Sequence, residues 1–373
     1  MNGATISALL AQCRAGFEAE ALEDLRRIAR PAIVGPETAT AGNGYAIARF
    51  VTGRAISLDD LARAATRAAP VFARSIVLAT GPQALVNETG KRVADRVTPL
   101  LAAIEPLRAL APFASCWIEF PDTNDGKALS PLARSLEARV GQRMRDLDAL
   151  ADAPGRPRLH VFLATGQLAW IGVDDARFGS PWPMGIPRLR MPHGAPSRST
   201  LKLAEAFETL LGDRADSALR EGMHAVDLGA APGGWSWQLA RRGLHVTAVD
   251  NGALRSDVAI DPRVHHVRND GFTFRPRHPV DWLTCDIVDS PMRIATLVAG
   301  WIADGIARRA IFNLKLPMKK RYAEVDRCRD AILGVCEDRG VHVSLRIRQL
   351  YHDREEVTGY LARNASSRRK RHR

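Results

Sequence analysis

Residues 225–240 read AVDLGAAPGGWSWQLA, and this stretch decides the fold of the second half of the chain. A strand-like apolar run leads through Gly229, Gly233 and Gly234 directly into a run with helical spacing. Glycines let the backbone approach a ligand where a Cβ atom would collide with it. The loop does not read G-x-G-x-x-G, and Pro232 lacks the N–H that a pyrophosphate-binding loop offers. The stretch therefore predicts a ligand site after a strand of an α/β sheet and disfavours a dinucleotide.

Strand-like and helix-like runs alternate on both sides of this loop. Strands are expected at 224–228, 245–250, 282–288 and 310–316, and helices at 235–243 and 296–306. Such alternation is typical of a doubly wound, mostly parallel sheet, so we predict a Rossmann-like α/β domain. The last two strand-like runs, 341–350 and 355–363, are separated by a short polar segment and suit an antiparallel pair at the edge of that sheet.

Carboxylates follow several of the expected strands. Asp250 ends the second strand, roughly 20 residues after the glycine loop, where a carboxylate can accept both hydroxyls of a ligand ribose. Asp227, Asp270 and Asp286 also lie at or just after strand ends. Each alone is more often a loop or helix cap. Together they predict that four carboxylates converge on a nucleoside-type ligand.

The first half of the chain has a different pattern. Helices are expected over 14–30, 57–69, 89–104 and 132–146, strands over 33–39, 44–50, 75–80 and 116–120, and a hairpin over 158–175. The changes in pattern along the whole chain predict its domains. We expect an α+β subdomain over 1–70, a second α+β domain over 71–180, a linker rich in Pro, Gly and Arg over 181–198, the cofactor-binding domain over 199–363, and a disordered basic tail over 364–373.

The charge balance points to a polyanionic partner. Lys plus Arg number 53 against 41 Asp plus Glu, the formal net charge is +12, and the sequence pI is about 10.1. Nucleic acid fits this balance best, although charge alone also suits a merely soluble basic protein. The five cysteines show neither CxxC pairs nor a Cys/His ligand spacing, which favours a reduced cytoplasmic setting without a metal site. No stretch predicts a signal peptide or a membrane span.

The stretch DLGAAPGGW at 227–235 resembles the cofactor loop of the FtsJ-like RNA ribose 2′-O-methyltransferases. A Lys, Asp, Lys, Glu tetrad is the hallmark of that family. This chain offers Lys202, Asp286 and Lys315 in that order, followed by the adjacent Glu355 and Glu356. We favour Glu356 because it directly precedes the Val of the following strand, and strand alternation puts only one of the two on the active face.

Longer phrases are similar to one subfamily, the bacterial 23S rRNA cytidine 2′-O-methyltransferases, in which a THUMP-containing region precedes the methyltransferase domain. The phrases are WPMGIPRL at 182–189, PSRSTLKL at 196–203, FNLKLPMKKRY at 312–322 and QLYHDREEV at 349–357. The resemblance implies that Lys315 is the proton acceptor. It also implies S-adenosyl-L-methionine as cofactor, contacted by Ser199, Gly229, Ala231, Pro232, Gly233, Gly234, Asp250, Asp270 and Asp286.

The chemistry of the tetrad leaves two roles open for Lys315. A lysine with an ordinary pKa near 10.4 is charged at neutral pH and is not a base. One hypothesis is that the charge of Lys202 and burial under the substrate lower the pKa of Lys315, while Asp286 and Glu356 orient both amines. In the competing version Lys315 stays charged and stabilises the developing alkoxide.

Other functions remain to be weighed against this one. The resemblance implies an enzyme acting on 23S rRNA, either naked or in an early assembly intermediate. We also expect a monomer, which no residue pattern indicates. The alternatives are methylation of another RNA, an RNA-binding protein with an inactive methyltransferase domain, a small-molecule methyltransferase and a nicotinamide-dependent oxidoreductase. The basic charge disfavours the small-molecule substrate, and the Pro232 loop disfavours nicotinamide.

Overall fold

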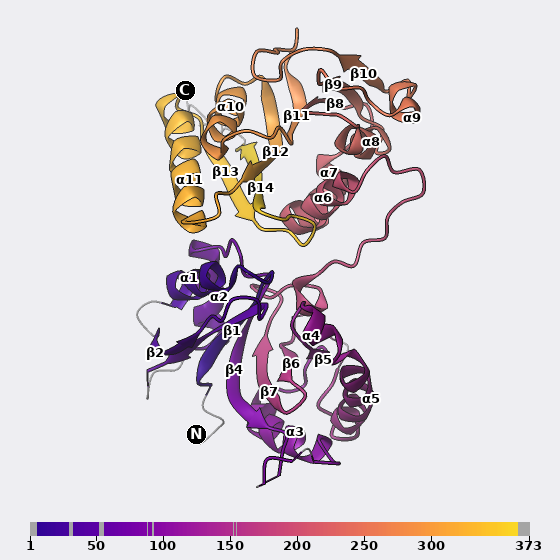
Figure 1. The fold of residues 1–373 in the computed structure, drawn as a ribbon. Helices are drawn as coiled ribbons and strands as arrows, with labels where there is room; N and C mark the ends of the chain where they lie inside the picture. Colours follow the sequence, from indigo (N-terminus) through magenta and orange to yellow (C-terminus); the bar gives the residue numbers. More distant parts are fainter. Residues whose placement is uncertain are drawn as a thin grey trace, which may run out of the picture. The chain divides into compact units, whose positions relative to one another are not determined.

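The computed structural model describes residues 6–29, 33–51, 56–87, 89–91, 93–151, 153 and 155–364. The chain forms two compact units, Met1–Ile186 and Pro187–Arg373 (Figure 1). The border between them falls inside the segment 181–198, which the sequence predicts as a linker. Residues 365–373 of the expected basic tail lie outside the described residues. Within the described ranges, no helix is long and apolar enough to cross a membrane.

The first unit is built on one mixed sheet. Its strand order is β2 (Ile33–Thr38), β3 (Tyr45–Phe50), β1 (Ala8–Gln12), β4 (Ser75–Ala84), β7 (Leu168–Asp174), β6 (Arg158–Thr165) and β5 (Cys116–Glu119). Its longer helices are α1 (Glu18–Ala29), α2 (Leu58–Arg67), α3 (Val97–Ile104) and α5 (Ser130–Asp146), and α4 (Asn124–Lys127) is a single turn. β1 pairs with both β3 and β4, so strands on either side of residue 70 share one sheet and one apolar core.

One helix of this unit is shorter than the sequence predicts. The expected helix over 89–104 is wrong in its first half, because α3 begins only at Val97. Asp95 explains the start, since its Oδ1 accepts the backbone N–H groups of Val97 and Thr98 at 2.9 and 3.3 Å. A carboxylate that binds the first free N–H groups of a helix fixes its N-terminus.

The second unit has the predicted doubly wound sheet. Its strand order is β10 (Val264–Val267), β9 (His245–Val249), β8 (His224–Leu228), β11 (Val280–Cys285), β12 (Ala307–Lys315), β14 (Glu356–Arg363) and β13 (Val343–Arg348). The first five strands are parallel, and β14 runs antiparallel to both β12 and β13, which confirms the expected antiparallel edge.

Helices cover both faces of this sheet (Figure 1). They are α6 (Ser199–Ala206), α7 (Ala215–Ala218), α8 (Gly234–Ala240), α9 (Ser256–Ala259), α10 (Pro291–Ala303) and α11 (Arg321–Asp338). The predicted helix over 296–306 is displaced, because α10 begins five residues earlier, where the Ser290 hydroxyl accepts the Arg293 N–H at 3.3 Å. It ends before Gly305, whose φ of +75° is left-handed and closes the helix.

Candidate active site

The carboxyl ends of the parallel strands carry the glycine loop. Gly229 and Gly233 have φ values of +76° and +109°, which side chains rarely adopt. A Cβ atom on Gly229 would lie 2.9 Å from Ile287 Cγ1 in the loop after β11, and one on Gly234 would collide with the Ser199 hydroxyl. Each glycine is therefore required by a close approach of another part of the second unit to the loop.

Two of the predicted cofactor carboxylates lie at this edge and are held by backbone groups. Asp250 accepts the Ala231 N–H at 2.9 Å through Oδ2 and the Gly252 N–H at 2.7 Å through Oδ1. Asp270 is exposed and accepts the Phe272 N–H at 2.9 Å. A carboxylate oxygen with one backbone donor keeps a further lone pair for a ligand hydroxyl.

Ser199 connects the glycine loop to α6. Its hydroxyl lies 2.7 Å from that of Ser197, and its carbonyl accepts the indole N–H of Trp235 at 3.0 Å. Because Trp235 belongs to α8, this contact ties the start of α6 to the helix that follows the loop. The structure thus places Ser199 beside the predicted cofactor site.

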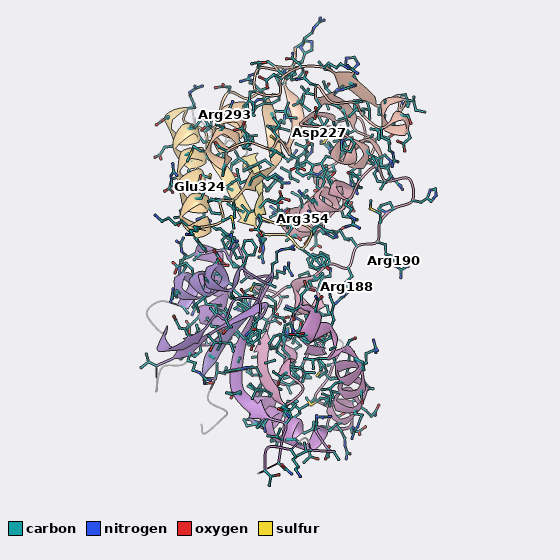
Figure 2. All side chains as sticks on the ribbon, in the orientation of Figure 1. Arg188, Arg190, Asp227, Arg293, Glu324 and Arg354 are labelled. Atoms are coloured by element: carbon teal, nitrogen blue, oxygen red, sulfur yellow. The ribbon has the colours of Figure 1, made fainter. Side chains whose placement is uncertain are left out.

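Asp227 does not join the other carboxylates, and the expectation that four of them converge is wrong in this respect. It is fully buried inside the second unit (Figure 2), where it accepts the hydroxyls of Ser236 at 2.7 Å and Thr284 at 2.9 Å. Burial raises its pKa to about 7, against the two hydroxyl donors, which lower it. Asp227, which lies on β8, therefore links this strand to α8 and β11 through its two side-chain hydrogen bonds.

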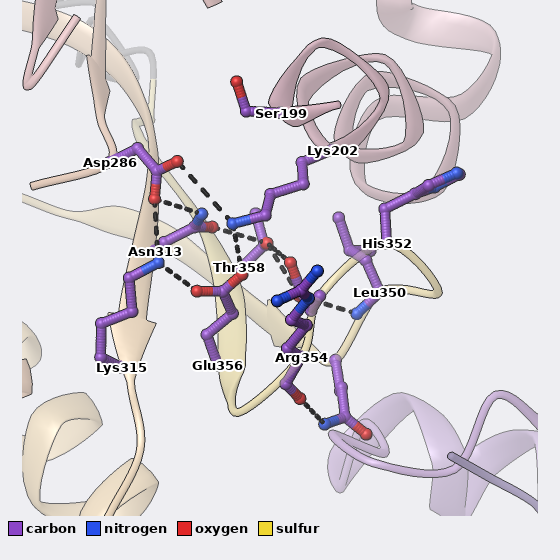
Figure 3. Close-up of polar contacts among 12 residues, drawn as sticks. Ser199, Lys202, Asp286, Asn313, Lys315, Leu350, His352, Arg354, Glu356 and Thr358 are labelled. Atoms are coloured by element: carbon purple, nitrogen blue, oxygen red, sulfur yellow. Dashed lines mark hydrogen bonds and ion pairs between the residues drawn. The ribbon is translucent and has the colours of Figure 1, made fainter. Parts of the chain in front are cut away.

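The four predicted tetrad residues come together from α6, β12, β14 and the loop after β11 (Figure 3). Lys315 Nζ donates to Asp286 Oδ1 at 3.1 Å and to Glu356 Oε2. Lys202 Nζ pairs with Glu356 Oε1 and lies 3.7 Å from Asp286 Oδ2. Each carboxylate thus faces both amines, which makes a closed arrangement of two positive and two negative groups.

The charge states of this cluster oppose the hypothesis of a lowered lysine pKa. Burial lowers the pKa of Lys315, but Asp286 and Glu356 outweigh it, and the pKa is raised overall. Burial likewise disfavours ionised Glu356, but Lys202 and Lys315 outweigh it and lower its pKa. In this structure Lys315 is therefore a charged ammonium group.

The adjacent glutamates differ in their surroundings. The Glu356 side chain is only 7% exposed and faces the two lysines. The Glu355 side chain is 60% exposed and pairs with Arg321 at 2.9 Å. Strand alternation separates the two, as expected from the position of Glu356 before Val357.

Three buried polar residues behind the tetrad were missed by the sequence reasoning. Asn313 donates to Asp286 at 2.8 Å, Thr358 lies 2.8 Å from Asn313, and Asp353 lies next to Thr358. Alternation along the strands could have found two of them, because Asn313 lies two residues before Lys315 on β12 and Thr358 two residues after Glu356 on β14. Such residues share a face of the sheet.

Two protein families match parts of this chain. Residues 195–300 match the family described as FtsJ-like methyltransferase, and residues 95–175 match the family described as ribosomal RNA large subunit methyltransferase M, N-terminal. Fold, glycine loop and family match define an S-adenosyl-L-methionine-dependent methyltransferase of the FtsJ-like class.

Full-length relatives narrow this class to one family. The ribosomal RNA large subunit methyltransferase M of Methylococcus capsulatus is 47% identical over 95% of this chain and 98% of its own. The protein of the same name from an Azoarcus species is 46% identical over 96% of both chains. The chain therefore belongs to the ribosomal RNA large subunit methyltransferase M family.

The chain's own residues fit the cofactor. The positive-φ glycines fix the turn that brings Ala231 next to Asp250, and each Asp250 oxygen has one backbone donor and keeps a lone pair for a ligand hydroxyl. Among the residues that the structure describes, no group of three His, Cys, Asp or Glu side chains could hold a metal ion.

Proposed function

We propose that this chain transfers the methyl group of S-adenosyl-L-methionine to the 2′-hydroxyl of a cytidine in 23S rRNA. The observation that carries the proposal is the position of Lys315 Nζ between Asp286 and Glu356, beside the loops that follow β8 and β11. The nucleotide and the RNA are taken from the family that the chain resembles. Methylation of another RNA, or RNA binding by an inactive domain, is the alternative.

The proposed cofactor contacts are distributed along the carboxyl edge of the sheet. When bound, S-adenosyl-L-methionine supplies an electrophilic methyl group on a positively charged sulfur. The glycine loop and Ser199 would hold its amino-acid part, and Asp250 would accept its ribose hydroxyls. The residues proposed to contact it are Ser199, Gly229, Ala231, Pro232, Gly233, Gly234, Asp250, Asp270 and Asp286.

The tetrad performs two tasks in this proposal. Lys202, Asp286 and Glu356 fix the Lys315 amine, so that the ribose oxygen meets it in one orientation, and positioning supplies much of the acceleration of a displacement. Lys315 first releases one ammonium proton to solvent, and the neutral amine then accepts the 2′-hydroxyl proton. Because its pKa is raised in the open site, this role requires the RNA to cover the tetrad and remove water from the amine, since desolvation lowers a lysine pKa.

We further propose that residues 71–180 bind RNA as a THUMP-like module, and that the enzyme acts as a cytoplasmic monomer. The family match over 95–175 supports a role for this region that is tied to the same enzyme family. Naked 23S rRNA and an early assembly intermediate are both candidate substrates.

The direct test is methyl transfer to 23S rRNA from cells that lack the gene. Purified full-length protein receives radiolabelled S-adenosyl-L-methionine, and 2′-O-methyl groups are mapped by their resistance to alkaline cleavage. We expect label at one cytidine and its loss in Lys315→Ala, with Arg327→Ala as the control, since the Arg327 side chain is exposed on α11 and lies outside the tetrad. Cofactor binding without label on naked or particle-bound 23S rRNA would contradict the proposal and favour another RNA or an inactive domain.

A further inference from the structure

A chain of buried polar groups leads away from the tetrad into the interior (Figure 3). Asn313 Nδ2 donates to Asp286 Oδ1 at 2.8 Å, and Thr358 Oγ1 lies 2.8 Å from Asn313 Oδ1. Thr358 Oγ1 also lies 3.1 and 3.0 Å from the two carboxyl oxygens of Asp353. Asn313, Thr358 and Asp353 are each 0% exposed, so bulk solvent does not reach them.

The orientation of the Asn313 amide is set by the tetrad. Asp286 lies beside two ammonium groups, 3.1 Å from Lys315 and 3.7 Å from Lys202, and is therefore an acceptor. An amide turned the other way would put its oxygen against this carboxylate. The amide N–H must face Asp286, so Asn313 Oδ1 must face Thr358 and needs a donor there.

The number of protons available to these hydrogen bonds determines whether Asp353 is protonated. The Thr358 hydroxyl has one proton, and the Asn313 oxygen at 2.8 Å needs it. An ionised Asp353 is also only an acceptor, so one of the two oxygens would face the hydroxyl oxygen with no hydrogen between them. A protonated Asp353 removes the conflict, because it donates to Thr358 while Thr358 donates to Asn313.

The surroundings of Asp353 agree with this count. Its Oδ2 accepts the Leu350 N–H at 2.9 Å, which leaves Oδ1 to carry the proton. The charged groups that face it are Glu356 on β14 and Lys202 and Glu205 on α6. Burial first, and then the negative charge of Glu356, hold the pKa of Asp353 well above its usual range.

We propose that Asp353 is a protonated acid at neutral pH and that it positions the tetrad through Thr358 and Asn313, which orient Asp286. These three are positioning residues, since none of them faces the reacting atoms. The tetrad then remains a balanced set of two ammonium and two carboxylate groups. The inference rests on the proposed function only for its effect on catalysis, whereas the protonation of Asp353 does not.

Infrared spectroscopy tests the protonation without any activity measurement. The full-length protein at neutral pH should show the carbonyl stretch of a protonated carboxylic acid, and part of this absorption should vanish in Asp353→Asn. Asp227, with a pKa of about 7, contributes a band of its own, so Asp227→Asn is measured alongside to assign it. If the spectra show no acid band that depends on Asp353, the inference is overturned, even where methyl transfer proceeds.

Matched variants test the positioning role. An asparagine at 353 can donate to Thr358 and accept from Leu350 as the acid does, so Asp353→Asn should restore most of the kcat that Asp353→Ala loses. Thr358→Val should lower kcat about tenfold with little change in KM for the cofactor, since one oriented hydrogen bond is lost. Thr296→Val removes an exposed hydroxyl on α10 and serves as control.

The outcomes separate this inference from the proposed function. Equal losses in Asp353→Asn and Asp353→Ala would show that Asp353 acts as an anion and would overturn the relay. A Thr358→Val protein with unchanged kcat would overturn the positioning role. A wild-type protein that shows the Asp353 band but transfers no methyl group to 23S rRNA would refute the proposed substrate and leave the protonated acid supported.

Discussion

At the scale of single residues, a substitution of Lys315 distinguishes a proton acceptor from a purely electrostatic role. Arginine in its place keeps the positive charge and can pair with Asp286 and Glu356, but it does not release a proton. If Lys315 is the proton acceptor, Lys315→Arg should lower kcat by about 10²- to 10⁴-fold, the usual contribution of a general base. Cofactor affinity, measured by calorimetry, should stay close to that of the wild type. An active Lys315→Arg enzyme would instead assign a purely electrostatic role.

Asp227 should make the stability of the second unit depend on pH. Its pKa is about 7 in the folded protein, against 3.8 for an ordinary aspartate, so the folded state binds an extra proton between these pH values. Stability should therefore fall as pH rises from about 4 to 7 and level off above, with a total cost on the order of 4 kcal/mol. Asp227→Asn should remove the part of this slope that Asp227 contributes, because an amide can bond both hydroxyls without charge, whereas the raised pKa of Asp353 keeps its own contribution in both proteins.

Urea unfolding at pH 5 and pH 8 measures this effect. Wild type should be less stable at pH 8 than at pH 5, and the variant should change much less between the two. Parallel changes in both proteins would show that Asp227 does not titrate in this range.

The sequence predicts the four tetrad residues better than it predicts the buried residues behind them. Lys202, Asp286 and Lys315 stand in recognisable phrases, and alternation selects Glu356 over its neighbour. Asp353 carries no such signal, because a charged residue in a polar segment between strands reads as exposed. Its burial arises from tertiary packing around the turn after β13, which no local pattern encodes. Asp227 was misplaced for a related reason: position at a strand end does not fix the face of the sheet that the side chain occupies.

At the scale of elements, the loop between β12 and α11 is arranged to meet a polyanion. Pro317, Met318, Lys319 and Lys320 are all exposed directly after the proposed catalytic lysine. Lys320 adopts a left-handed backbone with φ of +57°, a conformation that costs a non-glycine residue roughly 1–2 kcal/mol. We propose that this lysine contacts an RNA phosphate, and the alternative is that it contributes only surface charge.

A pair of substitutions at Lys320 separates charge from strain. Lys320→Ala and Lys320→Gly both remove the charge, so both should weaken RNA binding alike and lower its salt dependence. Only glycine relieves the left-handed backbone, so Lys320→Gly should be more stable than Lys320→Ala by about 1 kcal/mol. Filter binding at several salt concentrations and thermal unfolding measure the two effects. Equal stability of the two variants would remove the argument from strain.

Element boundaries illustrate where local patterns fail. Both mispredicted helices, α3 and α10, were misplaced at their starts, where a single side chain, Asp95 or Ser290, binds the first free N–H groups. The periodicity of apolar residues continues past such capping residues, so it does not show at which residue the helix begins. The strands that were predicted in the second unit lie within three residues of the observed bounds, but β1, β10 and the helices α6 and α11 were not predicted.

At the scale of the whole molecule, the net charge of +12 should make the affinity for RNA decrease as the salt concentration rises. Part of this charge lies on α5 of the first unit, within the segment proposed to bind RNA, where Arg139 and Arg143 line a concave site of about 560 Å³ together with Asp95 and Asp146. Both arginines are exposed. The site carries two arginines against two aspartates, and its two exposed guanidinium groups are candidate contacts for an RNA backbone.

Replacing both arginines with alanine tests whether the first unit binds RNA. The double variant should bind 23S rRNA fragments more weakly, and the slope of log affinity against log salt should fall by roughly 0.7–0.9 for each lost phosphate contact. Since the substitutions leave the second unit intact, cofactor affinity should not change. Arg327→Ala with Arg308→Ala removes two positive charges from the second unit and is the control for net charge. If both double variants lose the same affinity and slope, the RNA responds to overall charge, and the first unit has no specific contact at α5.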